Sequence, residues 1–184
     1  MRTSLFVFAA AVLLMPAISS AQDNDQTLRA MRDEMARAKD RLELKIDSRT
    51  QPVRPYFIEY RLLDLDVREV VAQFGALVTT TRTRNRFMNV EARVGDYKQD
   101  SSNFISDEGF RGFIGSTGSV GIDRDYDSLR QDLWIATDQA FKEAVDGYSR
   151  KQAYLNSLAN QNQYDDFSKV KTVQLIEPLV APDW

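Results

Sequence analysis

The most regular hydrophobic pattern in the chain is a period-two alternation within residues 79–96. Alternate residues of an extended strand lie on opposite faces. One face would carry Met88, Val90, Ala92 and Val94, and the other would carry Phe87, Asn89, Glu91 and Arg93. The pattern predicts a half-buried strand, in which Val90→Asp is strongly destabilising and Glu91→Ala is nearly silent.

Apolar residues recur at spacings of three and four in two other stretches, one on each side of this strand. The first contains Leu28, Met31, Met35, Ala38 and Leu42, and the second contains Leu129, Leu133, Ala136, Ala140, Ala144 and Tyr148. This spacing is typical of amphipathic helices. We expect the second helix to open at Asp127 and Ser128, with a capping box over residues 128–131, and to end near Leu158. The heptad pattern of the first helix lasts barely two heptads, so packing on a sheet is favoured over a coiled coil.

Further strands are predicted between the two helices. They run in the order strand 56–63, turn 64–66, strand 67–81, hairpin turn 82–85, the strand already described, and a short strand at 97–104. Gly75 would mark a bend or bulge, as glycine inside a strand pattern often does. The predicted fold is therefore α+β: an antiparallel β-sheet of three to four strands, arranged as a hairpin or meander, with two long amphipathic helices packed on one face.

The N-terminus has the pattern of a secretory signal peptide. Arg2 precedes an apolar run at residues 5–15, and small residues at 19–21 allow cleavage after Ala21. The run is shorter than the roughly 20 residues that span a bilayer, so a membrane anchor is the weaker alternative. We expect an exported protein, periplasmic or extracellular, with residues 1–21 as signal peptide, 22–160 as one α+β domain and 161–184 as an irregular tail or linker.

The composition excludes several kinds of chemistry and partner. The chain has no histidine, which removes Ser-His-Asp and Cys-His nucleophile systems and histidine zinc sites. It has no cysteine, so the fold of an exported protein would be stabilised by its core without disulfides. The formal net charge of -3 gives no electrostatic reason to expect nucleic acid or an anionic membrane as a partner.

Two loop motifs have some features of ligand sites. Asp123, Asp125 and Asp127 alternate as in a calcium loop, but Ser128 and Trp134 stand where such a loop needs glycine and glutamate. We expect a solvated loop whose acids favour the following helix N-terminus. Glycines also recur every third residue between Gly109 and Gly121 without the lysine of a phosphate loop. A mobile surface loop is the plain interpretation, and a flap near a ligand groove is the alternative.

Three polar motifs remain. Arg82, Arg84 and Arg86 form a small basic cluster at the predicted hairpin turn, suited to solubilising an exposed hairpin or to holding a peptide carboxylate. Ser116 lacks the flanking pattern of a nucleophile elbow and has no base. Asp165 and Asp166 are more typical of a loop pair than of a catalytic dyad. No catalytic, cofactor-binding or metal-binding residue is predicted in this chain.

Five runs of sequence bear on the family of the protein. They are residues 55–60 (PYFIEY), 74–78 (FGALV), 90–97 (VEARVGDY), 133–142 (LWIATDQAFK) and 165–168 (DDFS). In this order they resemble the N-terminal domain of exported members of the TldD/PmbA metallopeptidase family, long labelled modulators of DNA gyrase. The likeness covers nearly all of the chain after the signal peptide.

The resemblance implies an N-terminal α+β domain that precedes a larger C-terminal domain. In the family that second domain carries zinc in an HExxxH motif, cleaves unfolded peptides and usually acts in a dimer. This chain ends at Trp184 and has no histidine, so none of the family's catalytic residues can be carried over. Zinc would lie in the missing C-terminal domain.

We therefore expect a non-catalytic domain, a fragment of a longer enzyme, that helps enclose a peptide-binding groove. Its partners would be a C-terminal metallopeptidase domain or a separate catalytic subunit, an unfolded peptide, and a second copy in a dimer. Nucleic acid and, after signal cleavage, the membrane are not expected as partners. The alternative is a stand-alone periplasmic binding or partner protein without catalytic activity.

Overall fold

The computed structural model describes residues 25–45, 51–106, 109–111, 115–157, 164–173 and 175. The elements are α2 (Gln26–Arg41), β1 (Pro55–Gln73), β2 (Ala76–Val94), β3 (Phe104–Ser106), β4 (Gly109–Arg111), β5 (Gly115–Val120) and α3 (Tyr126–Ser157). The predicted signal peptide, residues 1–21, lies outside the described residues.

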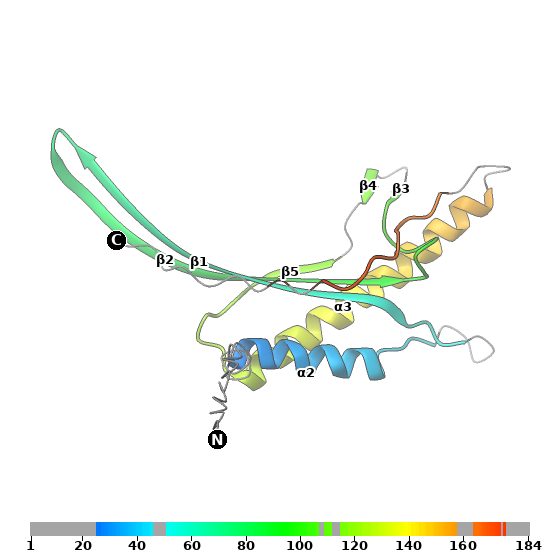
Figure 1. Cartoon of the computed structure of the whole chain (residues 1–184). Helices are drawn as coiled ribbons and strands as arrows, with labels where there is room; N and C mark the ends of the chain where they lie inside the picture. The colour runs from blue at the N-terminus through cyan, green and yellow to red at the C-terminus, as the bar shows by residue number, and fades with distance from the viewer. Residues whose placement is uncertain are drawn as a thin grey trace, which may run out of the picture.

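The main sheet has the strand order β1-β2-β5, and both of its pairings are antiparallel. Strands β3 and β4 pair separately in a small hairpin. Both helices lie on the same side of the main sheet (Figure 1), where α3 packs against β2 and β5 and α2 packs against α3. This arrangement confirms the predicted α+β fold with two long helices on one face of an antiparallel sheet.

The core confirms the predicted faces of the central strand. Met88, Val90, Ala92 and Val94 are all buried, and Val90 is 0 % exposed. They meet a row of apolar residues of α3 that recur at helical spacing: Leu129, Leu133, Ala136, Ala140, Phe141 and Ala144. In α2 the buried residues are Ala30, Glu34 and Ala38, so the buried stripe is rotated away from Leu28, which is 38 % exposed.

The predicted turns are wrong. Residues 64–66 lie inside β1 and residues 82–85 lie inside β2, where Asp64 is opposite Arg86 and Asp66 is opposite Arg84. The chain reverses at Phe74 and Gly75, whose φ angles are 51° and 80°. Positive φ at both central residues is the geometry of a two-residue hairpin turn. Gly75 therefore makes the turn rather than a bulge.

Two other predictions, one of a strand and one of a loop, are also wrong. Residues 97–99 form bends, with an isolated bridge between Gly95 and Asp100, so no strand fills residues 97–104. The glycine-rich stretch, predicted as a mobile loop, instead supplies β4 and β5. Pairing β5 with the open edge of β2 satisfies backbone hydrogen bonds, and this tertiary context overrides the weak strand propensity of glycine and serine.

Aspartates cap both helices. The Asp25 carboxylate accepts hydrogen bonds from the backbone N–H groups of Thr27 and Leu28 at the start of α2. The Asp125 carboxylate accepts one from the backbone N–H of Ser128 at 2.8 Å, and these bonds lower the pKa of Asp125 below its usual value. Ser128 is therefore inside α3, and the predicted capping box at residues 128–131 is wrong.

The face of the sheet opposite the helices is partly covered by the C-terminal segment. The backbone N–H groups of Asp166 and Phe167 donate to the carbonyls of Lys98 and Tyr97. The guanidinium of Arg93 lies 4.1 Å from the ring centre of Phe167. Glu91, which also lies on this face and pairs with Arg93, is 6 % exposed. The expectation that Glu91 faces solvent is wrong.

Candidate functional site: the projecting arm

The outer half of the β1–β2 hairpin projects beyond the helices as a long curved ribbon (Figure 1). Every residue from 63 to 84 is exposed, whereas at the base of the same hairpin most of β2 is buried and most of β1 is partly buried. We call residues 63–84 the arm. A long exposed strand pair is unusual because its backbone edges and apolar side chains are open to other chains.

The two faces of the arm differ in chemistry. Residues directly opposite each other in an antiparallel pair share a face. The face that continues from the helix side is charged, with Asp64, Asp66 and Arg68 opposite Arg86, Arg84 and Arg82. The other face carries Leu63, Leu65, Val67, Glu69 and Val71 opposite Phe87, Asn85, Thr83, Thr81 and Thr79. The apolar face therefore points away from the helices and has no cover among the described residues.

Ion pairs on the charged face hold the two strands in register. The guanidinium of Arg86 donates to both oxygens of Asp64, at 2.6 and 2.7 Å, and that of Arg82 donates to both oxygens of Asp66, at 2.8 and 2.5 Å. Hydrogen bonds from these guanidinium groups lower the pKa of both carboxyls below the usual value. Such two-point pairing fixes geometry as well as charge.

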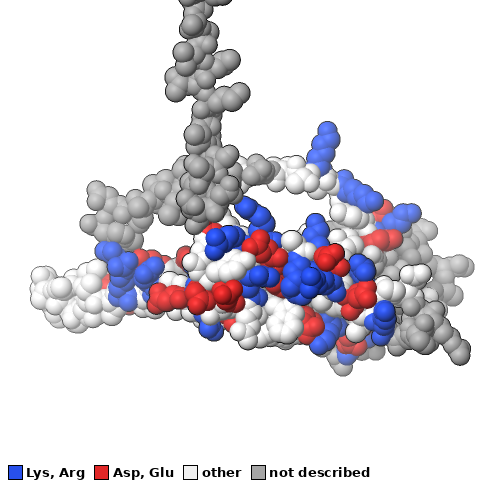
Figure 2. Space-filling model, turned by 90° about the horizontal axis from the view of Figure 1, so that it is seen from below, with Lys and Arg blue, Asp and Glu red and all other residues white. Residues whose placement is uncertain are grey.

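The tip of the arm is uncharged. No acidic or basic residue lies between Val70 and Thr81. Phe74 is 100 % exposed, and Val70 and Leu77 are each 66 % exposed. Seen from the helix side, positive and negative side chains are interspersed over the body, while the end of the arm is white (Figure 2). The tip is thus an apolar projection from a charged protein.

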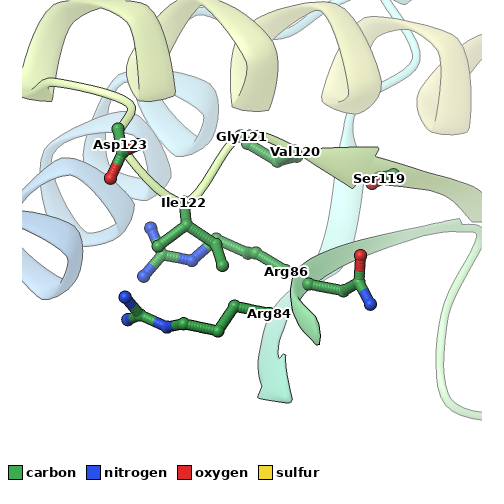
Figure 3. Close-up of a pocket in the computed structure, with 8 residues that line it drawn as sticks. Arg84, Arg86, Ser119, Val120, Gly121, Ile122 and Asp123 are labelled. Atoms are coloured by element: carbon green, nitrogen blue, oxygen red, sulfur yellow. The ribbon is translucent and has the colours of Figure 1, made fainter. Parts of the chain in front are cut away.

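A pocket of about 420 Å³ lies at the base of the arm (Figure 3). It is lined by Arg84, Asn85, Arg86, Ser119, Val120, Gly121, Ile122 and Asp123. Arg86 is paired with Asp64, but the guanidinium of Arg84 makes no hydrogen bond or ion pair within the described part of the chain. Of the three arginines predicted to hold a peptide carboxylate, Arg84 is therefore the one left to do so.

The remaining motif residues are dispersed. Asp123 lines the pocket and Asp125 caps α3, and the described residues contain no group of three or more acidic side chains placed to hold a metal. The backbone of Ser116 pairs with Val90 in the sheet. Asp166 pairs with Lys151 at 2.6 Å, so it anchors the C-terminal segment.

Sequence reasoning missed the arm because it placed turns at both of its ends. The signal was present: Leu63, Leu65 and Val67 alternate with Asp64, Asp66 and Arg68, which is a period-two pattern with one charged and one apolar face. Aspartate and asparagine favour turns, and that local preference misplaced the chain reversal.

No family model, curated protein or solved structure matches this chain. Among the described residues, neither helix combines the length and apolar character that crossing a bilayer requires.

Proposed function

We propose that this chain is a non-catalytic binding domain whose arm docks against another polypeptide. The observation that carries the proposal is the uncovered apolar face of Leu63, Leu65 and Val67, of which Leu63 and Val67 are each 51 % exposed. Full burial of such a side chain contributes roughly 1.5 to 3 kcal/mol. A polypeptide laid along this face would gain that energy and would cover a surface that otherwise promotes aggregation.

The partner we favour is the catalytic part of an exported TldD/PmbA-like zinc metallopeptidase, as a C-terminal domain or a separate subunit. The arm would then form one wall of a groove that receives an unfolded peptide. Arg84 would hold a carboxylate of that peptide, and zinc would be supplied by the catalytic part. The resemblance supports this choice: one of the similar runs (74–78) lies at the tip of the arm, and another (90–97) includes the end of β2.

The alternative is a stand-alone exported protein that binds unfolded peptides unaided. The guanidinium of Arg84 favours it, because it lies at the pocket at the base of the arm, on the charged face, where it could hold a peptide carboxylate. Both hypotheses predict that the arm binds unfolded polypeptide. A stable complex with a TldD/PmbA-type catalytic domain, detected by gel filtration, would support the first hypothesis, and the lack of such a complex would support the second.

A fluorescence anisotropy titration with labelled, reduced casein tests docking on the arm. Leu65→Asp places a charge on the apolar face, and we expect it to weaken binding about tenfold, equivalent to ~1.4 kcal/mol. The matched control is Ile135→Asp on α3, where an apolar side chain is 52 % exposed away from the arm. Equal binding by the two variants would contradict docking on the arm.

A further inference from the structure

The outer edge of β1 is a second open feature of the arm, separate from its apolar face. β1 is the first strand in the order β1-β2-β5, so its described residues pair on one side only. Natural edge strands are often blocked by proline, by a bulge or by charged side chains, lysine above all. This edge carries charges of both signs, which can therefore pair with those of another copy: Asp64, Asp66, Arg68 and Glu69. Residues 63–71 contain no proline or lysine, and the register shift of the arm lies beyond them, between Val71 and Ala72.

We propose that this edge pairs with the same edge of a second copy of the chain, antiparallel and centred on Val67. The two arms would then form one four-stranded ribbon. A twofold axis perpendicular to the sheet keeps the apolar faces of both arms on one side. This pairing uses the strand edge, so it is compatible with a partner on the apolar face and does not depend on that partner's identity.

The order of charges along β1 selects the register. Like charges directly opposite each other destabilise an antiparallel pair, and opposite charges stabilise it. The twofold axis passes through the central residue, which therefore lies opposite its own copy. If that residue were Asp64, Asp66, Arg68 or Glu69, two like charges would face each other. Centring on Leu65 would place Asp64 opposite Asp66 of the second copy. Among residues 64–69, Val67 is the only centre that places no like charges opposite each other.

Centring on Val67 also creates two attractive contacts. Asp66 of each copy lies opposite Arg68 of the other copy, on the charged face. Asp66 already accepts two hydrogen bonds from Arg82, and a carboxylate has room for more. On the apolar face, Val67 meets its own copy and Leu63 meets Val71. Glu69 then lies opposite Leu65, where its carboxylate stays in water.

Single-cysteine variants test the register in the full-length chain, which has no cysteine of its own. Residues opposite each other in an antiparallel pair have Cα atoms about 4.5 to 5.5 Å apart, within disulfide reach. Val67→Cys should therefore form a disulfide-linked dimer under mild oxidation. Thr83→Cys, which lies opposite Val67 on β2 and so would lie on an outer strand of the four-stranded ribbon, should not. Leu63→Cys mixed with Val71→Cys should cross-link, while each alone should not.

Charge reversal provides a second, independent readout. Asp66→Arg alone should weaken self-association in sedimentation velocity about tenfold, since it creates two like-charge contacts. Adding Arg68→Asp should restore association, because the contacts re-form with reversed signs and Asp at 68 lies opposite Arg82 within the arm. Monomers at all concentrations, or equal cross-linking through positions 67 and 83, would overturn the proposal. Neither result would affect casein binding by the apolar face.

Discussion

Val90 shows what a single buried position contributes to this fold. Its side chain is 0 % exposed in the layer between β2 and α3, so Val90→Asp would bury an unpaired charge. We expect the free energy of unfolding to fall by about 3 kcal/mol or more in urea denaturation. The control is Thr83→Asp on the exposed arm, where the expected change is within about 0.5 kcal/mol. Equal losses would mean that the faces of β2 are assigned wrongly.

Glu91 is unsuitable as the silent control that the alternation predicts. It is 6 % exposed and pairs with Arg93, whose guanidinium also lies 4.4 Å from the ring centre of Phe57. Removing its carboxylate would leave Arg93 without its counter-charge in a partly buried site, which carries a stability cost. The sequence could not reveal this, because the cover comes partly from residues near position 167.

Tyr60 gives the domain a pH dependence in the alkaline range. Its hydroxyl lies 2.8 Å from the hydroxyl of Thr137, and burial raises its pKa from 10.0 to about 12. The folded state therefore keeps the phenol proton to higher pH than the unfolded chain does. The stabilisation is complete below pH 10 and is lost as pH rises toward about 12.

We expect Tyr60→Phe to cost about 1 kcal/mol at neutral pH, because the hydrogen bond is lost. Between pH 10 and about 12 the difference in unfolding free energy between wild type and variant should shrink, since only the wild type has this phenol to ionise. Urea denaturation at several pH values measures that difference. If the difference in unfolding free energy between wild type and Tyr60→Phe stayed constant over this pH range, the Tyr60 phenol would be exposed to solvent.

At the scale of elements, the two-residue turn determines whether the arm forms. Both Phe74 and Gly75 have positive φ, which glycine adopts readily and L-residues other than asparagine and aspartate adopt at a cost. Gly75→Ala should destabilise the arm by about 1 kcal/mol through its backbone alone, since no atom lies within 4 Å of an added Cβ. Phe74→Asn should act in the opposite direction.

Amide hydrogen exchange of residues 76–84 measures both effects. Exchange should speed up about fivefold in Gly75→Ala and slow down in Phe74→Asn, a fivefold change being about 1 kcal/mol. The amides of α3 should be unchanged in both variants and serve as the internal control. If amide exchange changed in the same direction in both variants, that result would contradict a turn with positive φ at Phe74 and Gly75.

The elements predictable from sequence are those whose pattern is long and amphipathic. Spacings of three and four placed both helices, and period-two alternation placed the buried face of β2. The ends of strands were not predictable, because Asp64 and Asn85 belong to residue types that favour turns while cross-strand pairing holds them extended. Strand β5 was missed because its glycine and serine residues have little strand propensity of their own.

At the scale of the whole molecule, a buried ion pair ties the C-terminal segment to the body. The ammonium of Lys151 lies 2.6 Å from Asp166 and donates to the carbonyl of Ser102 at 2.8 Å, and the two charged side chains are only 7 % and 15 % exposed. Asp166→Ala would leave the ammonium without a counter-charge. We expect a loss of about 3 kcal/mol in unfolding free energy.

The neighbouring Asp165 is exposed and provides the matched control. Asp165→Ala should change the free energy of unfolding by less than about 0.5 kcal/mol. If Asp166→Ala were equally silent in the same urea titration, the C-terminal segment would not be part of the folded body. The arm has no comparable attachment among the described residues beyond its own hairpin, and that contrast underlies the docking proposal.

The most direct test of that proposal is the environment of Leu65 before and after a polypeptide is added. An environment-sensitive fluorophore on Leu65→Cys should emit as in water in the free protein, and its emission should shift to the blue when reduced casein is titrated in. The same fluorophore on Ile135→Cys should not shift. A Leu65 label that is already blue-shifted in the free protein, or that responds to casein no more than the Ile135 label does, would contradict an open apolar arm that binds polypeptide.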